Sequence, residues 1–298
     1  MSPDITPDMQ IPLRSLLFVP GNRESMLEKA TTARPDAFVP DLEDSVPPNE
    51  KLNARERVGR ALPSFAKTGI PVIPRLNGIG SEWLEADIEA TVGPHLYGVS
   101  IGKIQTPADI LHIDELLLRA ERRANLDAGQ IRLVPWIETA RAVLECFPIC
   151  TASSRIVAIA FGAEDLTLDM GIRRSTDDSE VSVPRSLTCL AAAAAGLPAL
   201  DTPFFAFRDP EALARNSEAS KKLGFRGKFA IHPAQIDTIN GIFAPSQDEI
   251  DEARRIIEAF DSAAQEGRGS TSLDGLVVDV PVVERARALL QRAGVRAD

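Results

Sequence analysis

Cysteine is scarce in this sequence, and its few copies have no spacing typical of a metal site. The 298 residues include three cysteines, Cys146, Cys150 and Cys189, an odd number. Cys146 and Cys150 stand four residues apart in a predicted helix, where two thiols on one face are usually small core residues. This usage fits a reducing compartment.

Long apolar runs are missing as well. No stretch approaches the roughly 18 consecutive apolar residues that a membrane-spanning helix needs, and the alanine run at 191–195 is too short. Residues 1–12, MSPDITPDMQIP, lack the basic region and apolar run of a signal peptide. We therefore expect a soluble, cytoplasmic protein with no membrane partner.

Basic residues are too few to suggest a nucleic-acid partner. The sequence has 33 Lys and Arg against 43 Asp and Glu, a formal net charge of −10, and nothing neutralises phosphates in bulk. The phosphate-binding patterns GxGxxG and GxxxxGK[ST] are absent, and no Ser–His–Asp arrangement is suggested by the sequence. These absences argue against an open dinucleotide-binding sheet and against a serine nucleophile.

The sequence does contain a repeated alternation of short apolar runs with longer segments of helical periodicity. The runs are almost continuously apolar, which is typical of parallel strands covered on both faces. In order they are SLLFVP, DAFVPDLED, IPVIPRLN, YGVSIGKI, IRLVPWIET, RIVAIAFGAED, LPALDTPF and KFAIHPAQ. Eight strand–helix units predict an α/β fold, the (β/α)8 TIM barrel, with a C-terminal helical extension.

The domain organisation follows from this pattern. We predict an N-terminal tail at residues 1–12, the barrel at residues 13–264 and a further segment at residues 265–298. That segment begins with a Gly- and Ser-rich linker, QEGRGSTSLDG, and continues as a short apolar piece and an amphipathic helix. Because the eight units are complete before it, we expect it to pack on the outside of the barrel or on a neighbouring subunit.

Charged and polar residues collect at the ends of the predicted strands, where barrels of this type build their active sites. Charge scattered at random over the surface would not gather at the same end of each strand. In strand order the set is Asp41, Glu43 and Asp44; Arg75 and Asn77; Lys103; Glu138; Glu164 and Asp165; Asp201; and His232.

The acids of this set predict a magnesium site. Mg²⁺ takes oxygen ligands and commonly binds one or two carboxylates together with water and substrate oxygens. Glu138 and Asp165 follow neighbouring strands, so their carboxylates can meet at one ion. Each acid alone could instead cap the helix that follows it, but for the set as a whole we favour the metal site.

Two other chemistries are less well supported. Zinc is not expected, because only one of the three histidines, His232, stands at a strand end, and we predict a structural role for it. Lys103 could form a Schiff base, but the surrounding acids keep a lysine protonated, so we predict a salt-bridged lysine.

Seven segments, spread from about Arg14 to Leu290, resemble the citrate lyase β-subunit (CitE-like) group of the HpcH/HpaI aldolase superfamily. They are RSLLFVPGNRESMLEKA, DLEDSVPPNEK, PRLNGIG, IETARAVL, FGAEDLTLDMG, AIHPAQIDTINGIFAPS and DGLVVDVPVVERA. The resemblance implies a Mg²⁺-dependent (β/α)8 enzyme that makes or breaks a carbon–carbon bond next to an acyl thioester. The family's substrates are malyl-, methylmalyl-, citramalyl- and citryl-thioesters, carried on CoA or on an acyl-carrier protein.

The resemblance also implies roles for particular residues. Glu138 of IET and Asp165 of GAED would hold the metal, and Arg75 of RLN would bind the 2-oxo acid as a catalytic residue. Asp279 of VVDVP is similar to a catalytic residue that reaches a neighbouring subunit's site and transfers protons, in a homotrimer or hexamer. We expect substrate contacts from Arg14, Arg75, Lys103 and Glu138, and support for these side chains from Asp41, Glu43, Asp44 and Glu164.

Some positions leave alternatives or depart from the family pattern. Asp279 could simply be the N-cap of the terminal helix, with Pro281 in its first turn. The fourth strand ends in GKIQ where PKVE is common, so Gly102 and Gln105 replace a proline and an acid. Pro40 stands before the acids of strand two, where an aliphatic residue is commoner. The proposed metal ligands and Arg75 are intact, so we expect activity.

The leading prediction is a Mg²⁺-dependent lyase that splits a malyl-, citramalyl- or citryl-CoA type thioester into a 2-oxo acid and an acyl-CoA. One alternative is a malate synthase or malyl-CoA thioesterase activity of the same site. Another is a subunit of a citrate lyase complex that acts on acyl-carrier-protein thioesters. An aldolase that works without CoA is disfavoured, because DGLVVDVPVVERA goes with the thioester branch of the family.

Overall fold

A computed structural model describes residues 11–175 and 177–295 of the chain, which forms two compact units, Met1–Asn240 and Gly241–Asp298. The tail predicted at residues 1–12 lies almost entirely outside the described residues. No helix of the described residues is long and apolar enough to cross a lipid bilayer.

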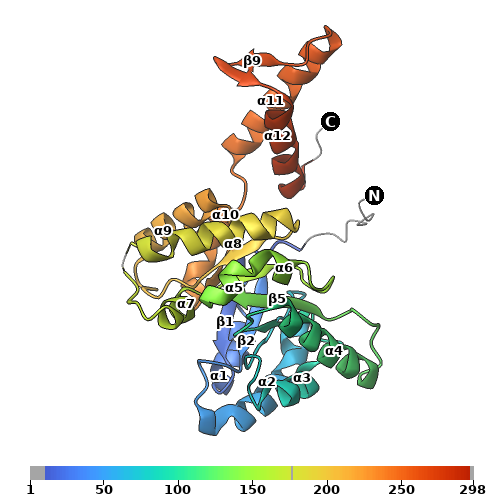
Figure 1. Ribbon diagram of the computed structural model, residues 1–298, viewed down its shortest axis with the longest axis vertical. Helices are drawn as coiled ribbons and strands as arrows, with labels where there is room; N and C mark the ends of the chain where they lie inside the picture. The colour runs from blue at the N-terminus through green and yellow to red at the C-terminus, as the bar shows by residue number, and fades with distance from the viewer. Residues whose placement is uncertain (1–10, 176, 296–298) are drawn as a thin grey trace. The chain divides into compact units, whose positions relative to one another are not determined.

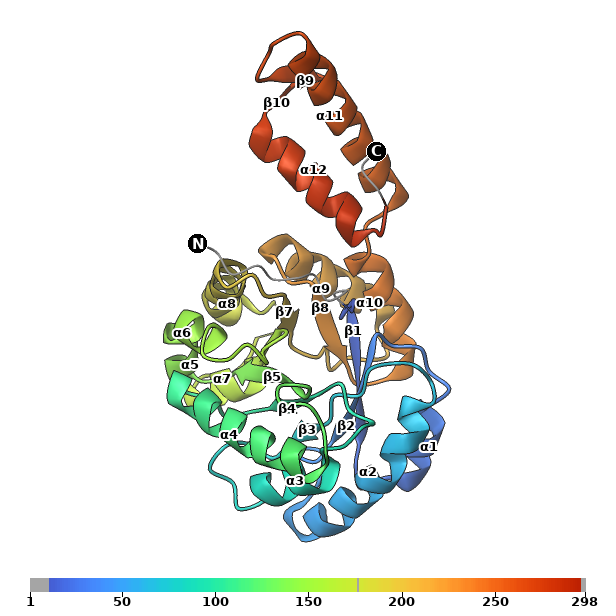
Figure 2. The same cartoon turned by 90° about the vertical axis from the view of Figure 1, so that its right-hand side faces the viewer.

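The first unit is a closed barrel of parallel strands, as the sequence predicted (Figures 1 and 2). Consecutive strands pair with each other, and β1 closes the barrel against β8 through the register Leu16↔Phe229. Within the described residues the strands are β1 (Ser15–Pro20), β2 (Ala37–Asp41), β3 (Arg75–Leu76), β4 (Gly98–Ile101), β5 (Arg132–Ile137), β6 (Ile159–Phe161), β7 (Ala199–Asp201) and β8 (Gly227–Ala230).

Helices surround these strands, and Figure 2 shows them outside the ring. They are α1 (Glu24–Ala30), α2 (Lys51–Ala66), α3 (Leu84–Thr91), α4 (Pro107–Arg123), α5 (Ala140–Leu144), α6 (Cys146–Cys150), α7 (Ala163–Asp169), α8 (Ser182–Ala194), α9 (Pro210–Leu223) and α10 (Ile236–Phe243). Short 3₁₀ turns precede α2, α8 and α10, namely η1 (Pro48–Glu50), η2 (Ser179–Val181) and η3 (Pro233–Gln235).

The strands are buried on both faces, which explains their nearly continuous apolar sequences. Alternate residues fill the barrel interior, a cluster that includes Leu16, Val39, Ile73, Trp136 and Phe229. Residues between them face the helices; for example, the ring of Phe38 lies 4.8 Å from the ring of Phe65 in α2. This alternation decides which strand residues can reach a site at the end of the barrel.

Strand β3 is much shorter than the run IPVIPRLN that predicted it. Pro71 and Pro74 lack the backbone N–H that a continuous ladder requires, so Val72 forms only an isolated bridge with Phe38. The strand direction is nevertheless kept, because the register Asp41↔Arg75 pairs β3 with the end of β2. The prolines therefore shorten the strand but leave Arg75 at the C-terminal end of the barrel, level with Asp41.

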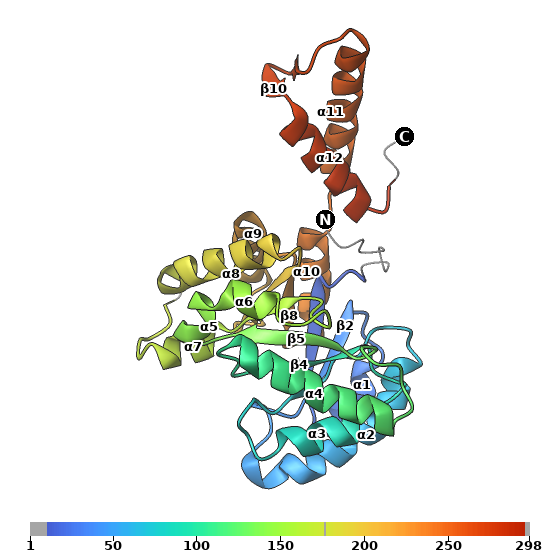
Figure 3. The ribbon, with the colours of Figure 1, turned by 45° about the vertical axis from the view of Figure 1, so that its right-hand side comes forward.

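The second unit consists of α11 (Gln247–Gln265), the hairpin of β9 (Thr271–Leu273) and β10 (Leu276–Val278), and α12 (Val280–Arg292), with α11 beside α12 in Figure 3. Asp274 and Gly275 form the two-residue turn, both with positive φ, a combination that favours tight hairpins. Part of the predicted linker is thus a strand and a turn.

The boundary between the units differs from the one predicted after residue 264. Helix α11, predicted as the last helix of the barrel, belongs to the second unit. The reason is its apolar face: Ala253 and Ile257 pack in one cluster with Val283, Ala286 and Leu290 of α12. Periodicity showed that α11 has an apolar face but not which element covers it.

Candidate active site

The predicted site residues that follow β2 to β6 meet at the C-terminal end of the barrel. Asp41 ends β2, Arg75 begins the short β3 at the level of Asp41, and Lys103 follows β4. Glu138 comes directly after β5, and Asp165 lies in the first turn of α7, just beyond β6.

Neither of the two proposed metal ligands caps a helix, which was the alternative for each acid. Thr139 caps α5, because its side chain accepts a hydrogen bond from the backbone N–H of Ala142. Helix α7 has Gly162 at its N-cap and no side-chain cap. The carboxylates of Glu138 and Asp165 are therefore free for other partners.

Lys103 is a partner of both carboxylates and links them. Its Nζ lies 2.5 Å from Oδ1 of Asp165 and 3.6 Å from Oε1 of Glu138. Its backbone N–H also donates to Glu138 Oε1 at 2.7 Å, with Lys103 in the left-handed region at φ +61°. Such strain costs energy and gathers at functional sites. Lys103 is thus the salt-bridged lysine that was predicted.

Two glycines make room for the carboxylate of Glu138. A Cβ placed on Gly102 would lie 2.6 Å from Glu138 Oε1, and a Cβ on Gly162 would lie 2.6 Å from Oε2. Gly102 follows β4 and Gly162 follows β6, so the strands on both sides of β5 leave space for this one side chain. The departure at Gly102 from the family's usual proline thus adjoins the proposed metal ligand.

This arrangement fits Mg²⁺. No group of three or more His, Cys, Asp or Glu side chains among the described residues is arranged to hold a metal ion. A metal here would therefore have two protein carboxylates, from Glu138 and Asp165, and would take its other ligands from water or substrate. Mg²⁺ is commonly held in this way, because it dehydrates reluctantly. The Lys103 ammonium shows that the space between the carboxylates attracts a cation.

Arg75 is the second centre of the site. Its Nε and Nη2 donate to the two carboxylate oxygens of Asp41, both at 2.7 Å, in the bidentate geometry that orients a guanidinium. Its Nη1 lies 3.0 Å from Glu43 Oε2 and 3.2 Å from Asp44 Oδ2. Three of the four predicted supporting acids, Asp41, Glu43 and Asp44, therefore surround Arg75.

An aromatic layer closes the barrel beneath these charges. The ring of Phe229 lies 4.5 Å from that of Trp136 and 5.1 Å from that of Phe18. The guanidinium of Arg75 lies over Phe18 at 4.7 Å and over Trp136 at 5.8 Å, within the range of cation–π attraction. The indole N–H of Trp136 donates to Ser100, so this layer has no unpaired indole.

Burial and like charge raise the pKa of two carboxyl groups at this site, whereas Arg75 lowers that of a third. Burial, the charge of Asp44 and that of Glu138 raise the pKa of Glu43 to about 8, against the opposing pull of Arg75. Burial and the charge of Asp165 raise the pKa of Glu138 to about 7. Burial would also raise the pKa of Asp41, but the charge and hydrogen bonds of Arg75 hold it below its ordinary value. The carboxylates at this end of the barrel thus carry more negative charge than Arg75 and Lys103 neutralise.

The structure does not bring every predicted residue to this site. Arg14 precedes β1 at the opposite, N-terminal end of the barrel, where its side chain binds both oxygens of Asp36. A substrate contact from Arg14 is therefore not supported. Glu164 lies next to Asp165 in sequence but pairs with Arg174 at 2.8 Å, so it does not support the two carboxylates proposed as metal ligands.

Asp279 and His232 have the structural roles that were considered for them. Asp279 is the N-cap of α12 in the second unit, where its Oδ1 accepts from the N–H of Val282 at 3.3 Å. His232 caps η3 by accepting from the N–H of Ala234, and its ring stacks on Phe207 at 5.0 Å.

Asp201 also stays out of the site, although it ends β7. Its neighbour Leu200 fills the barrel interior, so Asp201 faces the helices. There it binds Lys228 of β8 at 2.5 Å, Arg185 of α8 at 2.7 Å and the hydroxyl of Ser220 of α9 at 2.6 Å. Lys228 is fully buried. This cluster joins the sheet to two helices.

Sequence reasoning missed the residues that support the site from the backbone. Lys51 of α2 donates through Nζ to the carbonyls of Leu42 and Glu43, at 2.8 and 2.7 Å, and so holds the loop after β2. The aromatic layer and the two glycines beside Glu138 were missed as well. Strand alternation could have revealed part of the aromatic layer. Trp136 stands two residues before Glu138, so a Glu138 that reaches the site predicts that Trp136 also faces the barrel interior.

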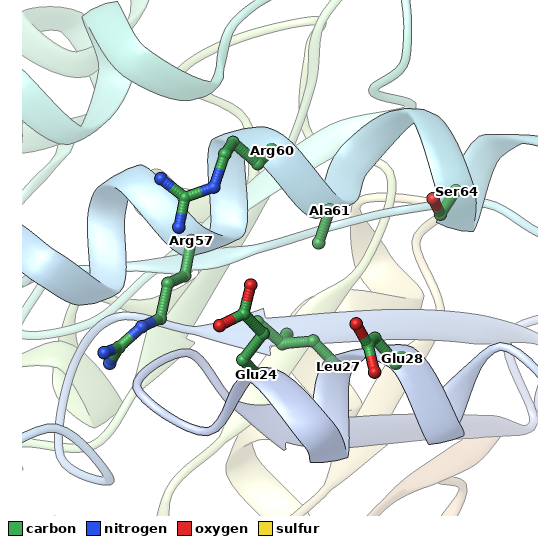
Figure 4. A pocket seen from close by; sticks show the side chains of 7 residues that line it. All are labelled: Glu24, Leu27, Glu28, Arg57, Arg60, Ala61 and Ser64. Atoms are coloured by element: carbon green, nitrogen blue, oxygen red, sulfur yellow. The ribbon is translucent and has the colours of Figure 1, made fainter.

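A hollow elsewhere on the barrel does not add to the site. It has a volume of about 130 Å³ and lies between α1 and α2. Figure 4 shows Glu24 and Glu28 of α1 on one side of it and Arg57 and Arg60 of α2 on the other. Its opposite charges come from two helices of the outer ring, and none belongs to the group around Glu138 and Arg75.

Comparison with known proteins places this site in a family. The chain matches the family model HpcH/HpaI aldolase/citrate lyase over residues 14–233. It is 38% identical to the citrate lyase subunit beta of Escherichia coli (strain K12), over 96% of this chain and 95% of that protein. It is 34% identical to a (3S)-malyl-CoA thioesterase of Cereibacter sphaeroides, over 95% of each.

A solved structure agrees. The CitE protein of Mycobacterium tuberculosis, solved in complex with magnesium, acetoacetate and coenzyme A, superimposes with a TM-score of 0.78 at 28% identity. The match covers 96% of this chain and all of that one. The chain therefore belongs to the HpcH/HpaI aldolase/citrate lyase family.

Proposed function

We propose that this protein is a Mg²⁺-dependent carbon–carbon lyase that cleaves a β-hydroxyacyl-CoA thioester, of the malyl-, citramalyl- or citryl-CoA type, into a 2-oxo acid and an acyl-CoA. One observation carries the proposal: two carboxylates from neighbouring strands, Glu138 and Asp165, converge on one cation position beside Arg75. The CitE protein of M. tuberculosis, a family member, was solved with magnesium, a small oxo acid and coenzyme A together.

The residues around Arg75 prepare it to hold a carboxylate. Asp41 fixes the plane of the guanidinium through two hydrogen bonds, and Phe18 covers one of its faces. A guanidinium held this way loses little freedom when it binds an anion, so more of the interaction remains as binding and orientation. Arg75 would thereby position the 2-oxo acid part of the substrate next to Glu138 and Asp165.

Glu138 and Asp165 would hold the Mg²⁺, and Lys103 would neutralise part of their charge. When bound, the ion would act as a Lewis acid that polarises a substrate oxygen. Lys103 is suited to a role as a cation, because the charge of Glu138 and the hydrogen bond to Asp165 outweigh burial and raise its pKa. An amine held protonated does not attack carbonyl groups, which argues against Schiff-base chemistry.

Cleavage also moves protons: one leaves the substrate hydroxyl, and another reaches the carbon that separates from the oxo acid. Asp279 remains the proposed residue for this transfer, on the strength of the family resemblance. Its place as the N-cap of α12 does not conflict with that role, since one carboxylate oxygen suffices for the cap. An Asp279→Asn variant would keep the cap and lose the titrating group.

The test is an assay of full-length protein with Mg²⁺ and a panel of malyl-, citramalyl- and citryl-CoA. We expect release of a 2-oxo acid from at least one of them, its loss with EDTA and its recovery with added Mg²⁺. Absence of oxo acid from every member of the panel would contradict the proposal.

A thioesterase or malate synthase activity is the second candidate, favoured by the similarity to the (3S)-malyl-CoA thioesterase of C. sphaeroides. A lyase leaves the thioester intact, whereas hydrolysis frees the CoA thiol. Thiol titration in the same assay separates the two: free CoA formed together with the hydroxy acid, without an oxo acid, would favour the hydrolytic activity.

A role in a citrate lyase complex is the third candidate, because a relative is the citrate lyase subunit beta of E. coli. The net charge of −10 is a poor match for an acidic carrier protein, so we rank it below free CoA. Lack of activity on CoA esters together with activity on acyl-carrier-protein thioesters would favour this role.

The remaining parts of the proposal concern assembly and location. We infer from the resemblance a homotrimer or hexamer in which the second unit packs on the barrel or on a neighbouring subunit, and light scattering measures its mass. We infer a cytoplasmic location, supported by the three buried cysteines, all of which are free thiols.

A further inference from the structure

Asp44 stands apart from the other acids around Arg75, because it is exposed. Its side chain is 60% accessible, compared with 2% for Asp41 and 8% for Glu43. Yet it reaches the same guanidinium, with Oδ2 at 3.2 Å from Nη1 of Arg75. An exposed carboxylate held on a buried arginine can be exchanged for another carboxylate at low cost.

The donors of Arg75 that a ligand can use are limited. Nε and Nη2 are bound to Asp41, and Phe18 covers one face of the guanidinium. Nη1 is the one nitrogen that Asp41 does not bind. Nη2 keeps one further N–H, so a carboxylate that pairs with the end of the guanidinium in bidentate geometry uses Nη2 together with Nη1, where Asp44 now accepts a hydrogen bond.

Glu43, the other acid near Nη1, cannot give way in the same manner. Its loop is held by Lys51, which donates to the Glu43 carbonyl at 2.7 Å, and by Asp41, which accepts from the Glu43 N–H at 3.0 Å. Its Oε2 is buried and makes no hydrogen bond within the described part of the chain, although it lies 3.0 Å from Nη1. Glu43 is thus a fixed neighbour, and Asp44 is the exchangeable one.

We propose that Asp44 occupies the place of the substrate carboxylate on Arg75 and sets the affinity for the 2-oxo acid by competing for Nη1. The inference rests on the proposed function, in which Arg75 binds that carboxylate. Binding then exchanges one carboxylate for another at Nη1, so Nη1 keeps an acceptor before and after the substrate binds. This competition lowers the affinity of Arg75 for the oxo acid. An exposed ion pair changes such a binding equilibrium by about two- to fivefold.

The experiment measures binding of oxaloacetate, of glyoxylate and of pyruvate to the full-length, Mg²⁺-loaded protein by calorimetry. Asp44→Asn should bind the oxo acid about two- to fivefold more tightly than the unchanged protein, and its KM for the oxo acid in the condensation direction should fall while kcat changes little. Glu164→Gln is the matched control. Glu164 is 54% exposed and pairs with an arginine, as Asp44 does. It lies at the same end of the barrel, in the first turn of α7 after β6, but it does not contact Arg75.

The possible outcomes separate the two proposals. Tighter binding in Asp44→Asn and not in Glu164→Gln supports the competition. Weaker binding in Asp44→Asn would show that Asp44 helps to hold Arg75 and would overturn it, as would equal tightening in both variants, which a general change of charge would cause. If the unchanged protein binds Mg²⁺ but none of the three oxo acids, the proposed function fails, and the role of Asp44 with it.

Discussion

Two of the clusters of charged side chains in the barrel differ in balance. The cluster around Asp201 lies between the sheet and the helices; Lys228, Arg185 and Ser220 all bind its carboxylate, and Arg185 also lies 3.9 Å from a second carboxylate, that of Asp178. The cluster at the barrel end gathers several carboxylates around Arg75 and Lys103, and the Oε2 atom of Glu43 has no hydrogen bond there.

The pKa shifts of the carboxyl groups record the difference. Burial would raise the pKa of Asp201, but Lys228 and Arg185 hold it below its ordinary value. Burial and neighbouring acids raise the pKa of Glu138 to about 7 and that of Glu43 to about 8. A balanced cluster holds the fold together, whereas the excess of carboxylates at the strand ends is where we propose that a metal cation binds in addition to Lys103.

The largest effect is expected from removing the unbalanced carboxylates. Glu138→Ala and Asp165→Ala should each abolish Mg²⁺ binding and lower the lyase rate by about a thousandfold or more, since a catalytic metal supplies several kcal/mol. Calorimetric Mg²⁺ titration and steady-state kinetics measure the two losses. Persistence of Mg²⁺ binding in both variants would show that the ligands are misassigned.

The balanced cluster should respond in stability instead. Asp201→Asn leaves Lys228 and Arg185 buried without their carboxylate, which should cost about 3–5 kcal/mol of unfolding free energy. Urea unfolding measures this cost, and the folded variant should keep the Mg²⁺ affinity of the unchanged protein. Glu138→Gln is the comparison, because it removes a charge from the crowded cluster and should not destabilise. An equal loss of unfolding free energy in Asp201→Asn and Glu138→Gln would show that the two clusters do not differ in this way.

A smaller effect is expected from filling the space beside Glu138. Gly162→Ala or Gly102→Ala would put a methyl group 2.6 Å from a Glu138 oxygen, so the carboxylate must shift. We expect Mg²⁺ affinity to fall about 10- to 100-fold, as for other groups that orient metal ligands. Gly241→Ala is the control, because a Cβ there meets nothing within 4 Å. Unchanged affinity in both test variants would mean that the glycines do not position Glu138.

The smallest effect is expected at the other end of the barrel. Arg14→Ala removes the pair with Asp36, which should lower the unfolding free energy by about 1 kcal/mol or less. The KM for the thioester should not change, because Arg14 precedes β1 and the site lies beyond the other end of the strands. A severalfold rise in KM would restore the substrate contact predicted for Arg14.

Much of this could be predicted from local sequence. The order of apolar runs and helical segments specifies parallel strands, and parallel strands place the residues that follow them at one end. Arg75, Lys103, Glu138 and Asp165 were found by that rule. The role of Glu164 was not, because its pairing with Arg174 depends on a loop that returns from farther along the chain.

What the sequence by itself determined is therefore the barrel, its active end and the family. Only the tertiary structure decided which charged residues face that end. Glu138 stands two residues after the inward-facing Trp136, whereas Asp201 follows the inward-facing Leu200 directly and so points to the helices. A shift of one residue along a strand reverses its face, and strands that are apolar on both faces do not reveal which face is which.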